Sequence, residues 1–187
     1  MSFLKTVFSV FSTRLFEKFI RQINSIIIGR TLGPSGLGLY TLFFTFAKNL
    51  HTISEFGLGA SGIFFIKRKR DESKKIIENA FLFSLFTGLI LAVIIFLFRY
   101  KISNYLLDDQ SLYILLLSLV IPFITVSAIF SSLLRGLNKF NDFNISTIMK
   151  PLFFLLFIFI FLIIYDGNVL SAVIGQVCSI IFTGLWL

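Results

Sequence analysis

Long apolar stretches fill most of the chain, and short polar segments separate them. A bilayer span needs about 20 mostly apolar residues. Six stretches meet this length, over residues 7–32, 37–66, 76–98, 112–134, 143–165 and 168–187. The pattern predicts an all-α fold, a polytopic bundle of about six transmembrane helices that forms a single domain over residues 1–187.

Prolines and glycines place the expected turns and bends. Gly33 and Pro34 begin a short run of turn-forming residues between the first two stretches, so a tight turn is expected there. Pro122 predicts a kink in the fourth helix. Pro151, which follows Lys150, predicts a break in the fifth.

The first predicted helix carries a charged stripe. The residues that fall on one helical face are Arg14, Glu17, Lys18, Arg21 and Ser25. Charges at membrane depth are costly and usually face a protein interior or a wet cavity. Because the stripe holds three cations and one acid, it suits an anionic cargo. Arg14, Lys18 and Arg21 are therefore candidate substrate-binding residues.

Two other interpretations of this stripe stay open. The helix can lie in the membrane interface with its cations toward the lipid headgroups. Alternatively, the charges form an internal network in which Glu17 is held between Arg14 and Arg21. The turn at Gly33 and the apolar run over residues 26–28 favour a spanning helix.

A second stripe follows in the second predicted helix. Its members are Lys48, Thr52, Glu55 and Gly59, with His51 at the edge. Lys48 joins the candidate substrate-binding residues, and His51 is expected to be a hydrogen-bonded packing residue. Glu55 either binds a coupling cation or proton or pairs with a cation of the first helix. Its distance from the turn predicts a pair with Arg14 or Lys18, which would close the cavity when cargo is absent.

Two further features each allow two interpretations. Residues 55–62 are rich in small side chains, which let helices pack closely and can also unwind a helix at a binding site. Close packing is the more common outcome. Lys150 either reaches a cavity or extends its side chain toward the cytoplasmic edge of the membrane.

The composition supports a membrane protein. Hydrophobic residues make up 57% of the chain and charged residues 14%, against about a quarter charged in soluble domains. The net charge of +8 would suggest a nucleic-acid partner in a soluble protein. Here the cations cluster in short loops, so the tendency of such loops to stay in the cytoplasm explains them, and no nucleic acid is expected.

The loop cations predict the orientation of the chain. Residues 67–75 hold six cations, and Lys5, Arg135 and Lys139 raise the count on that side to nine. The other side has three cations and several acids, namely Arg30, Arg99, Lys101, Asp108, Asp109 and Asp166. We therefore expect the N-terminus and the basic loop in the cytoplasm. The loop also has the composition of a site for anionic lipid headgroups.

The sequence offers few groups for catalysis. It has one histidine and one cysteine, Cys178, and it lacks a zinc pattern and a glycine-rich phosphate loop. We expect neither an enzyme nor a metal site or cofactor.

One segment resembles a known family. Residues 28–40 read IGRTLGPSGLGLY, which is similar to the end of the first helix in polysaccharide biosynthesis and export flippases. These belong to the multidrug/oligosaccharidyl-lipid/polysaccharide (MOP) superfamily and include O-antigen flippases. Residues 55–59 (EFGLG) and 135–140 (RGLNKF) also resemble family segments, although Glu55 stands where Asp is common. The chain corresponds to about the first half of a family member, so we expect it to be the N-terminal six-helix lobe, incomplete at its C-terminus.

The resemblance implies that the protein flips a lipid-linked oligosaccharide, carried on undecaprenyl diphosphate, across the bacterial cytoplasmic membrane. Its expected partners are this lipid, the membrane, and a missing C-terminal lobe or a second copy of the chain. Arginines suit a diphosphate because their guanidinium groups donate paired hydrogen bonds. Two alternatives are a scaffold subunit of a polysaccharide synthesis complex and a drug or metabolite antiporter of the same superfamily. The cationic stripe argues against the antiporter.

Overall fold

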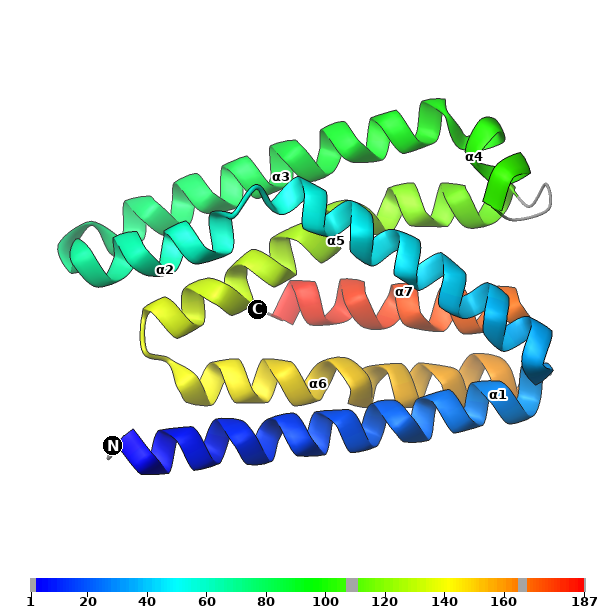
Figure 1. Ribbon diagram of the computed structural model, residues 1–187, viewed down its shortest axis with the longest axis horizontal. Helices are drawn as coiled ribbons and strands as arrows, with labels where there is room; N and C mark the ends of the chain where they lie inside the picture. The colour runs from blue at the N-terminus through cyan, green and yellow to red at the C-terminus, as the bar shows by residue number, and fades with distance from the viewer. Residues whose placement is uncertain (1–2, 107–110, 165–167, 187) are drawn as a thin grey trace.

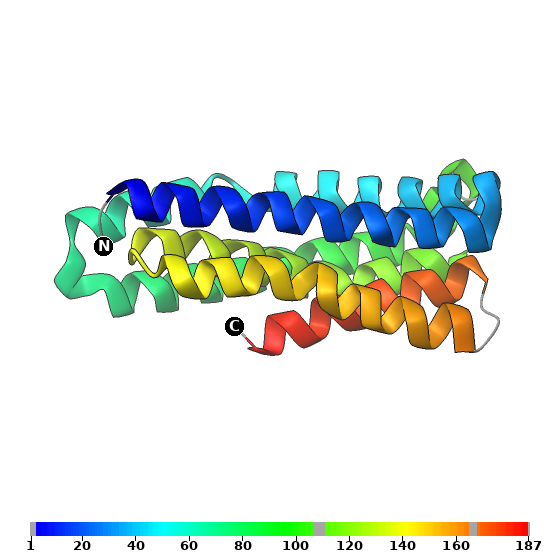
Figure 2. The same cartoon turned by 90° about the horizontal axis from the view of Figure 1, so that it is seen from below.

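The computed structural model describes residues 3–106, 111–164 and 168–186, and every regular element in this part of the chain is helical. The elements are α1 (Phe3–Glu55), α2 (Leu58–Arg68), η1 (Arg70–Glu72), α3 (Ser73–Leu97), α4 (Arg99–Leu106), α5 (Ser111–Gly136), α6 (Phe140–Ile158), η2 (Phe159–Ile164) and α7 (Val169–Trp186). The long helices lie side by side along one axis (Figure 1). The view from below places α1 on one side of the bundle and the end of α7 on the other (Figure 2). The predicted all-α bundle is confirmed.

α1 is folded back on itself at the predicted turn. Gly33 has φ 71° and ψ −179°, which interrupts the helical backbone. This region of backbone space is open almost only to glycine. Pro34 then fits the start of the second leg, because a first helical turn needs no backbone N–H at that position. Figure 1 shows the two legs of α1 running in opposite directions.

A second break separates α1 from α2 within the second predicted span. Phe56 and Gly57 both have positive φ, of 46° and 72°. Directly after this break, a Cβ added to Gly59 would lie 2.9 Å from Ser132 Oγ, and one added to Gly62 would lie 2.7 Å from a methyl carbon of Leu133. The small residues therefore do both things that the sequence allowed: they interrupt the helix and pack closely on α5.

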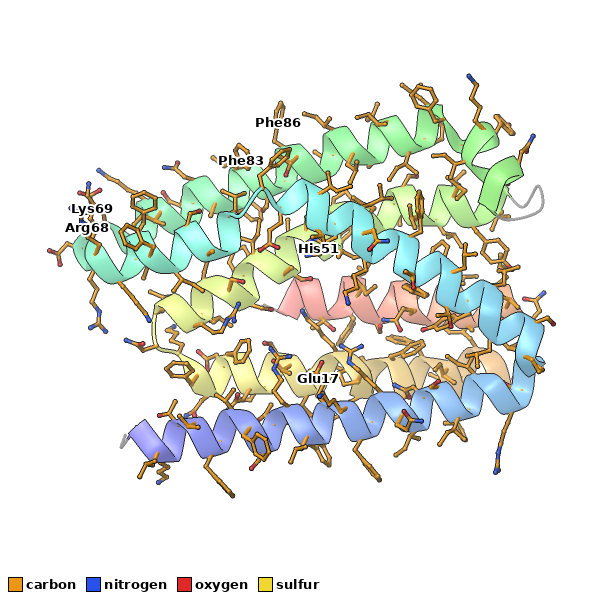
Figure 3. The ribbon with its side chains drawn as sticks, viewed as in Figure 1. Glu17, His51, Arg68, Lys69, Phe83 and Phe86 are labelled. Carbon is orange, nitrogen blue, oxygen red and sulfur yellow. The ribbon has the colours of Figure 1, made fainter. Side chains whose placement is uncertain are left out.

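α5 is the central helix of the bundle. Its buried residues Ile114, Leu117 and Ile121 form a core with Phe43 of α1 and Val173 of α7. α5 bends along its length (Figure 1) and contains Pro122, as predicted. By contrast, α3 exposes a row of large apolar residues that includes Phe83 and Phe86 (Figure 3), as a helix against lipid would.

Three helical segments have the length and composition of a membrane span. They are Arg70–Leu97, Leu112–Gly136 and Phe140–Phe161, and Val169–Gly184 is a shorter apolar helix. Neither leg of α1 is among these segments, and both legs pack into the same bundle (Figure 1). The bundle therefore agrees with a multi-pass membrane protein, while the number of six spans stays a prediction.

Some local predictions were wrong. α6 continues through Pro151, and its helix becomes irregular only at η2, a π-helical segment. Membrane helices can continue through a proline where other groups satisfy the backbone carbonyl that the proline leaves without a partner. α4 was not predicted as a separate helix. The predicted helix ends at Tyr165 and Leu187 lie outside the described residues, as do Asp108, Asp109 and Asp166.

The structure gathers the predicted cytoplasmic cations at one end. The N-terminal end of α1, the connection from α2 to α3 and the turn from α5 to α6 all lie at this end (Figure 1). Arg68 and Lys69 extend from it into solvent (Figure 3). The grouping of charges matches the prediction, although the compartment that this end faces remains a prediction.

Candidate functional site

The charged stripe of α1 forms a compact ion-pair cluster. Arg14 Nη1 donates to Glu17 Oε2 at 2.9 Å, and Arg21 Nε donates to Glu17 Oε1 at 3.0 Å. The Glu17 side chain is only 11% exposed, whereas those of Arg14 and Arg21 are 49% and 56% exposed. Glu17 lies on the side of α1 that faces α6 (Figure 3). Glu17 is thus held between Arg14 and Arg21, as one interpretation of the stripe expected, but both ion pairs lie within α1 and neither joins it to a second helix. Which of the three interpretations holds stays a prediction.

Arg21 also lines an interior cavity of about 260 Å³, which we call the inner cavity. Its polar lining residues come from α1, α5, α6 and α7 and are Arg21, Lys48, His51, Ser127, Lys150, Gln176 and Ser179. No carboxylate is among its lining residues. The cavity therefore combines three cations with hydrogen-bonding groups, which suits an anion that carries polar substituents.

A second, open cavity of about 1170 Å³ lies at the cationic end, and we call it the outer cavity. Arg14 lines it together with Lys67 of α2, Lys139 of the turn between α5 and α6, and Asp142 of α6. The guanidinium carbon of Arg14 lies 5.3 Å from the ring centre of Phe143, and that of Arg135 lies 5.4 Å from the same ring. Such cation–π contacts hold an arginine in place without neutralising it.

The predicted site residues are thus divided between the two cavities. Arg21 and Lys48 meet in the inner cavity, and Arg14 belongs to the outer one. Lys18 is exposed and lines neither of them. The helical face was predicted correctly, but Lys18 lies at the edge of that face.

Glu55 does not form the predicted pair. Among the described residues, no ion pair within 4.0 Å joins Glu55 to Arg14 or Lys18, and Arg14 pairs with Glu17 instead. The Glu55 carboxylate lies against Gly59, one turn further along, where the helix breaks. α1 runs without a further break from Gly33 to Glu55. The prediction failed because it considered only distance along the helix axis and not the direction in which the Glu55 side chain points.

His51 lies in the inner cavity and not in an apolar packing position. Its charged neighbours are Glu55 and Lys150. The buried Nδ1 atom of His51 has no hydrogen-bond partner in the described part of the chain. Figure 3 shows His51 on the second leg of α1, near the centre of the bundle. The expectation of a hydrogen-bonded packing residue is therefore not met.

Sequence reasoning overlooked Gln176 and left Lys150 open. Gln176 Oε1 accepts a hydrogen bond of 3.1 Å from the Tyr40 hydroxyl. Lys150 Nζ lies 3.4 Å from Ser131 Oγ and points to the inner cavity and not to the membrane edge. A side-chain amide in the uncharged, mostly apolar segment 169–182 was a usable signal for Gln176.

Comparisons with known proteins agree with this architecture. The family model described as "Polysaccharide biosynthesis protein" matches residues 3–187. Stage V sporulation protein B of Bacillus subtilis (strain 168) is 23% identical over 198 residues, which cover 97% of this chain and 38% of that protein. The structure of a MOP superfamily transporter from Pyrococcus furiosus, described as having a binding pocket of reverse polarity, superposes with a TM-score of 0.77. That match has 15% sequence identity and covers 97% of this chain and 43% of the transporter.

The chain thus spans about two fifths of the length of both relatives. The family match covers nearly all of the chain, and the structural match shows that its bundle has the fold of one part of that transporter. On this evidence, the chain belongs to the polysaccharide biosynthesis protein family.

Proposed function

We propose that this chain forms the first lobe of a transporter that moves a lipid-linked oligosaccharide across the bacterial cytoplasmic membrane. The cargo is an oligosaccharide, of the O-antigen type or a related glycan, carried on undecaprenyl diphosphate. The inner cavity is the observation that carries this proposal, because Arg21, Lys48 and Lys150 converge there without a lining carboxylate. A diphosphate can leave water only where cations such as these neutralise its charge, whereas the lipid tail can stay in the bilayer.

The residues take separate roles in this proposal. Arg21, Lys48 and Lys150 bind the diphosphate, and Gln176 and Ser179 offer hydrogen bonds to sugar hydroxyls. Because Glu55 lacks the predicted ion pair and lies near His51, we assign it to coupling with a cation or proton. Lys18 is given a supporting role at the headgroup region.

Both relatives extend well beyond the part that this chain matches, which suggests a second half of the transporter. We infer that a second lobe, from a continuation of this chain or from another copy, faces the inner cavity and completes it. The proposed orientation places the N-terminus in the cytoplasm. An antiporter for organic cations is disfavoured by the positive lining, and a scaffold subunit would have no use for a cationic cavity.

The test is glycan export by the full-length protein in cells that lack their own flippase. Arg21→Ala, Lys48→Ala and Lys150→Ala are each expected to lower export at least tenfold at unchanged protein level. Arg21→Lys should recover only part of the activity, because a lysine cannot donate the paired bonds of a guanidinium group. Lys101→Ala is the matched control, since it removes an exposed cation at the opposite end of the bundle. Normal export by a triple variant of the cavity cations would overturn the proposal.

A further inference from the structure

The two cavities are linked by one carboxylate. Glu17 binds Arg14, which lines the outer cavity, and Arg21, which lines the inner cavity. The two arginines are seven residues apart in α1, or about two helical turns. Glu17 is therefore the only described acid that pairs with a cation of both cavities.

The outer cavity has the chemistry of a site for an amphiphile with an anionic headgroup. Its cations Arg14, Lys67 and Lys139 come from three separate segments, and its apolar lining includes Val7, Val10, Phe11 and Phe140. The one acid in its lining, Asp142, lies 4.0 Å from Lys139 in an exposed pair that contributes little energy. The cavity thus keeps a positive charge beside an apolar wall.

The position of this cavity selects a lipid as its occupant. It opens at the cationic end of the bundle, next to large apolar residues of α1 that remain exposed, such as Leu4 and Phe8. A soluble anion would gain nothing from the apolar lining, whereas an acyl or prenyl chain would cover it. With a volume of about 1170 Å³, the cavity has room for a headgroup and the first part of a chain.

The Glu17 carboxylate is well suited to compete with such a headgroup. It occupies Nη1 of Arg14 and Nε of Arg21, the same donors that a phosphate would use. Its charge also acts on Lys150, which lies within electrostatic range of Glu17, Arg14 and Arg21. Glu17 thereby lowers the positive potential of both cavities at once.

We propose that the outer cavity is a loading site for the diphosphate headgroup of the lipid-linked cargo, and that Glu17 is the internal anion which this headgroup displaces on its way to the inner cavity. The inference rests on the proposed function and adds a second binding site and its gate. A diphosphate carries more charge and more acceptor oxygens than one carboxylate, so it can take both arginines from Glu17. After the cargo leaves, Glu17 rebinds them and favours release.

The experiment measures binding of undecaprenyl diphosphate to the full-length protein in neutral-lipid nanodiscs. Glu17→Gln is expected to tighten binding several-fold, because it removes the competing charge and keeps the size of the side chain. The same variant should lower export, since release becomes slower. Glu78→Gln is the matched control, because the Glu78 side chain is 59% exposed and its ion pair with Lys74 is long, at 4.0 Å. It should change neither value.

The exposed lysines provide a second test that does not disturb the core. Lys67→Gln and Lys139→Gln should slow association several-fold and leave dissociation nearly unchanged, as expected for charges at the rim of a site. Arg21→Ala should instead speed dissociation. Phosphatidylglycerol in tenfold excess should compete poorly.

Several outcomes would overturn the inference. Unchanged or weaker binding by Glu17→Gln would show that Glu17 only positions the arginines. Equal competition by phosphatidylglycerol would make the outer cavity a general anionic-lipid site. If Arg21→Ala weakens binding but the two lysine variants have no effect on association, the inference fails and the proposed function stands. If the wild-type protein does not bind undecaprenyl diphosphate, the proposed function itself fails.

Discussion

At the scale of single residues, buried polar side chains tie the helices of this bundle together. Asn24 of α1 is 2% exposed, and its Nδ2 atom donates a 3.1 Å hydrogen bond to the carbonyl oxygen of Pro151 in α6. Thr125 of α5 donates at 3.3 Å to the carbonyl oxygen of Ser84 in α3. In lipid, such bonds join helices that have little hydrophobic driving force to associate.

Replacing Asn24 tests how much one such hydrogen bond contributes to the stability of the protein. Asn24→Ala is expected to destabilise the protein by about 0.6 kcal/mol, the average for interhelical hydrogen bonds in a membrane protein, and by at most about 1.7 kcal/mol. The neighbouring Ser25→Ala is the control, since Ser25 is exposed and should tolerate the change. The measurement is thermal unfolding in detergent. Equal melting temperatures for the two variants would contradict the expected role of Asn24.

Residue pairs across helices were the hardest feature to predict from sequence. The spacing within one helix correctly placed Arg14, Glu17 and Arg21 on a common face. It could not show that Glu55 turns toward Gly59, because this depends on the break at Phe56 and Gly57. Gln176 of α7 contacts Tyr40 of α1, and no local sequence pattern predicts a contact between these two helices.

At the scale of elements, α3 and α5 meet at a point without room for a side chain. A Cβ atom added to Gly88 of α3 would lie 2.9 Å from the Pro122 Cα and 2.5 Å from Thr125 Oγ1. Backbone atoms cannot move aside as a flexible side chain can. Gly88 thus allows the close approach of the two helices, as small residues do in membrane bundles.

Gly88→Ala is expected to destabilise the bundle by about 1–3 kcal/mol, as other overpacked cores do. The matched control is Gly38→Ala in α1, where nothing lies within 4 Å of an added Cβ atom. Because alanine favours helices over glycine, this control should be neutral or slightly stabilising. Denaturation in mixed detergent micelles measures both variants. A Gly88→Ala protein as stable as Gly38→Ala would contradict the contact.

The predictions of helices and turns succeeded where the chain has residues that strongly favour a turn. Gly33 and Pro34 gave the turn of α1 correctly, because few other residues adopt its backbone conformation. Pro151 misled the prediction, since a proline breaks a helix only where its freed carbonyl finds no other support. The π-helical segment η2 has no such signal, as its sequence FIFLII is ordinary apolar helix.

At the scale of the whole molecule, charge is distributed very unevenly between the two ends. The basic loop, the N-terminal end of α1 and the turn between α5 and α6 share one end of the bundle (Figure 1). The sequence alone predicted this arrangement, because loop charges depend only on which spans they separate. The convergence of Arg21, Lys48 and Lys150 was not predictable in the same way, since it needs the packing of three helical segments.

Site-directed labelling tests the orientation. A cysteine at Lys69 in an otherwise cysteine-free protein, with Cys178 replaced by serine, should react with a membrane-impermeant maleimide only after the cells are opened. A cysteine at Lys101, at the opposite end, should react in intact cells. Both positions are exposed, so access is limited by the membrane and not by the fold. The reverse labelling pattern would invert the topology.

The fold of α1 also bears on how the protein is made. Its first leg carries five charged residues between Arg14 and Arg30, and a charge near the bilayer centre opposes insertion through the translocon by about 2.5–3.5 kcal/mol. The connection at Gly33 is so short that the second leg emerges from the ribosome directly behind the first. We therefore expect the two legs to leave the translocon together as a helical hairpin, with Glu17 already offsetting the arginines before α5 and α6 have been synthesised.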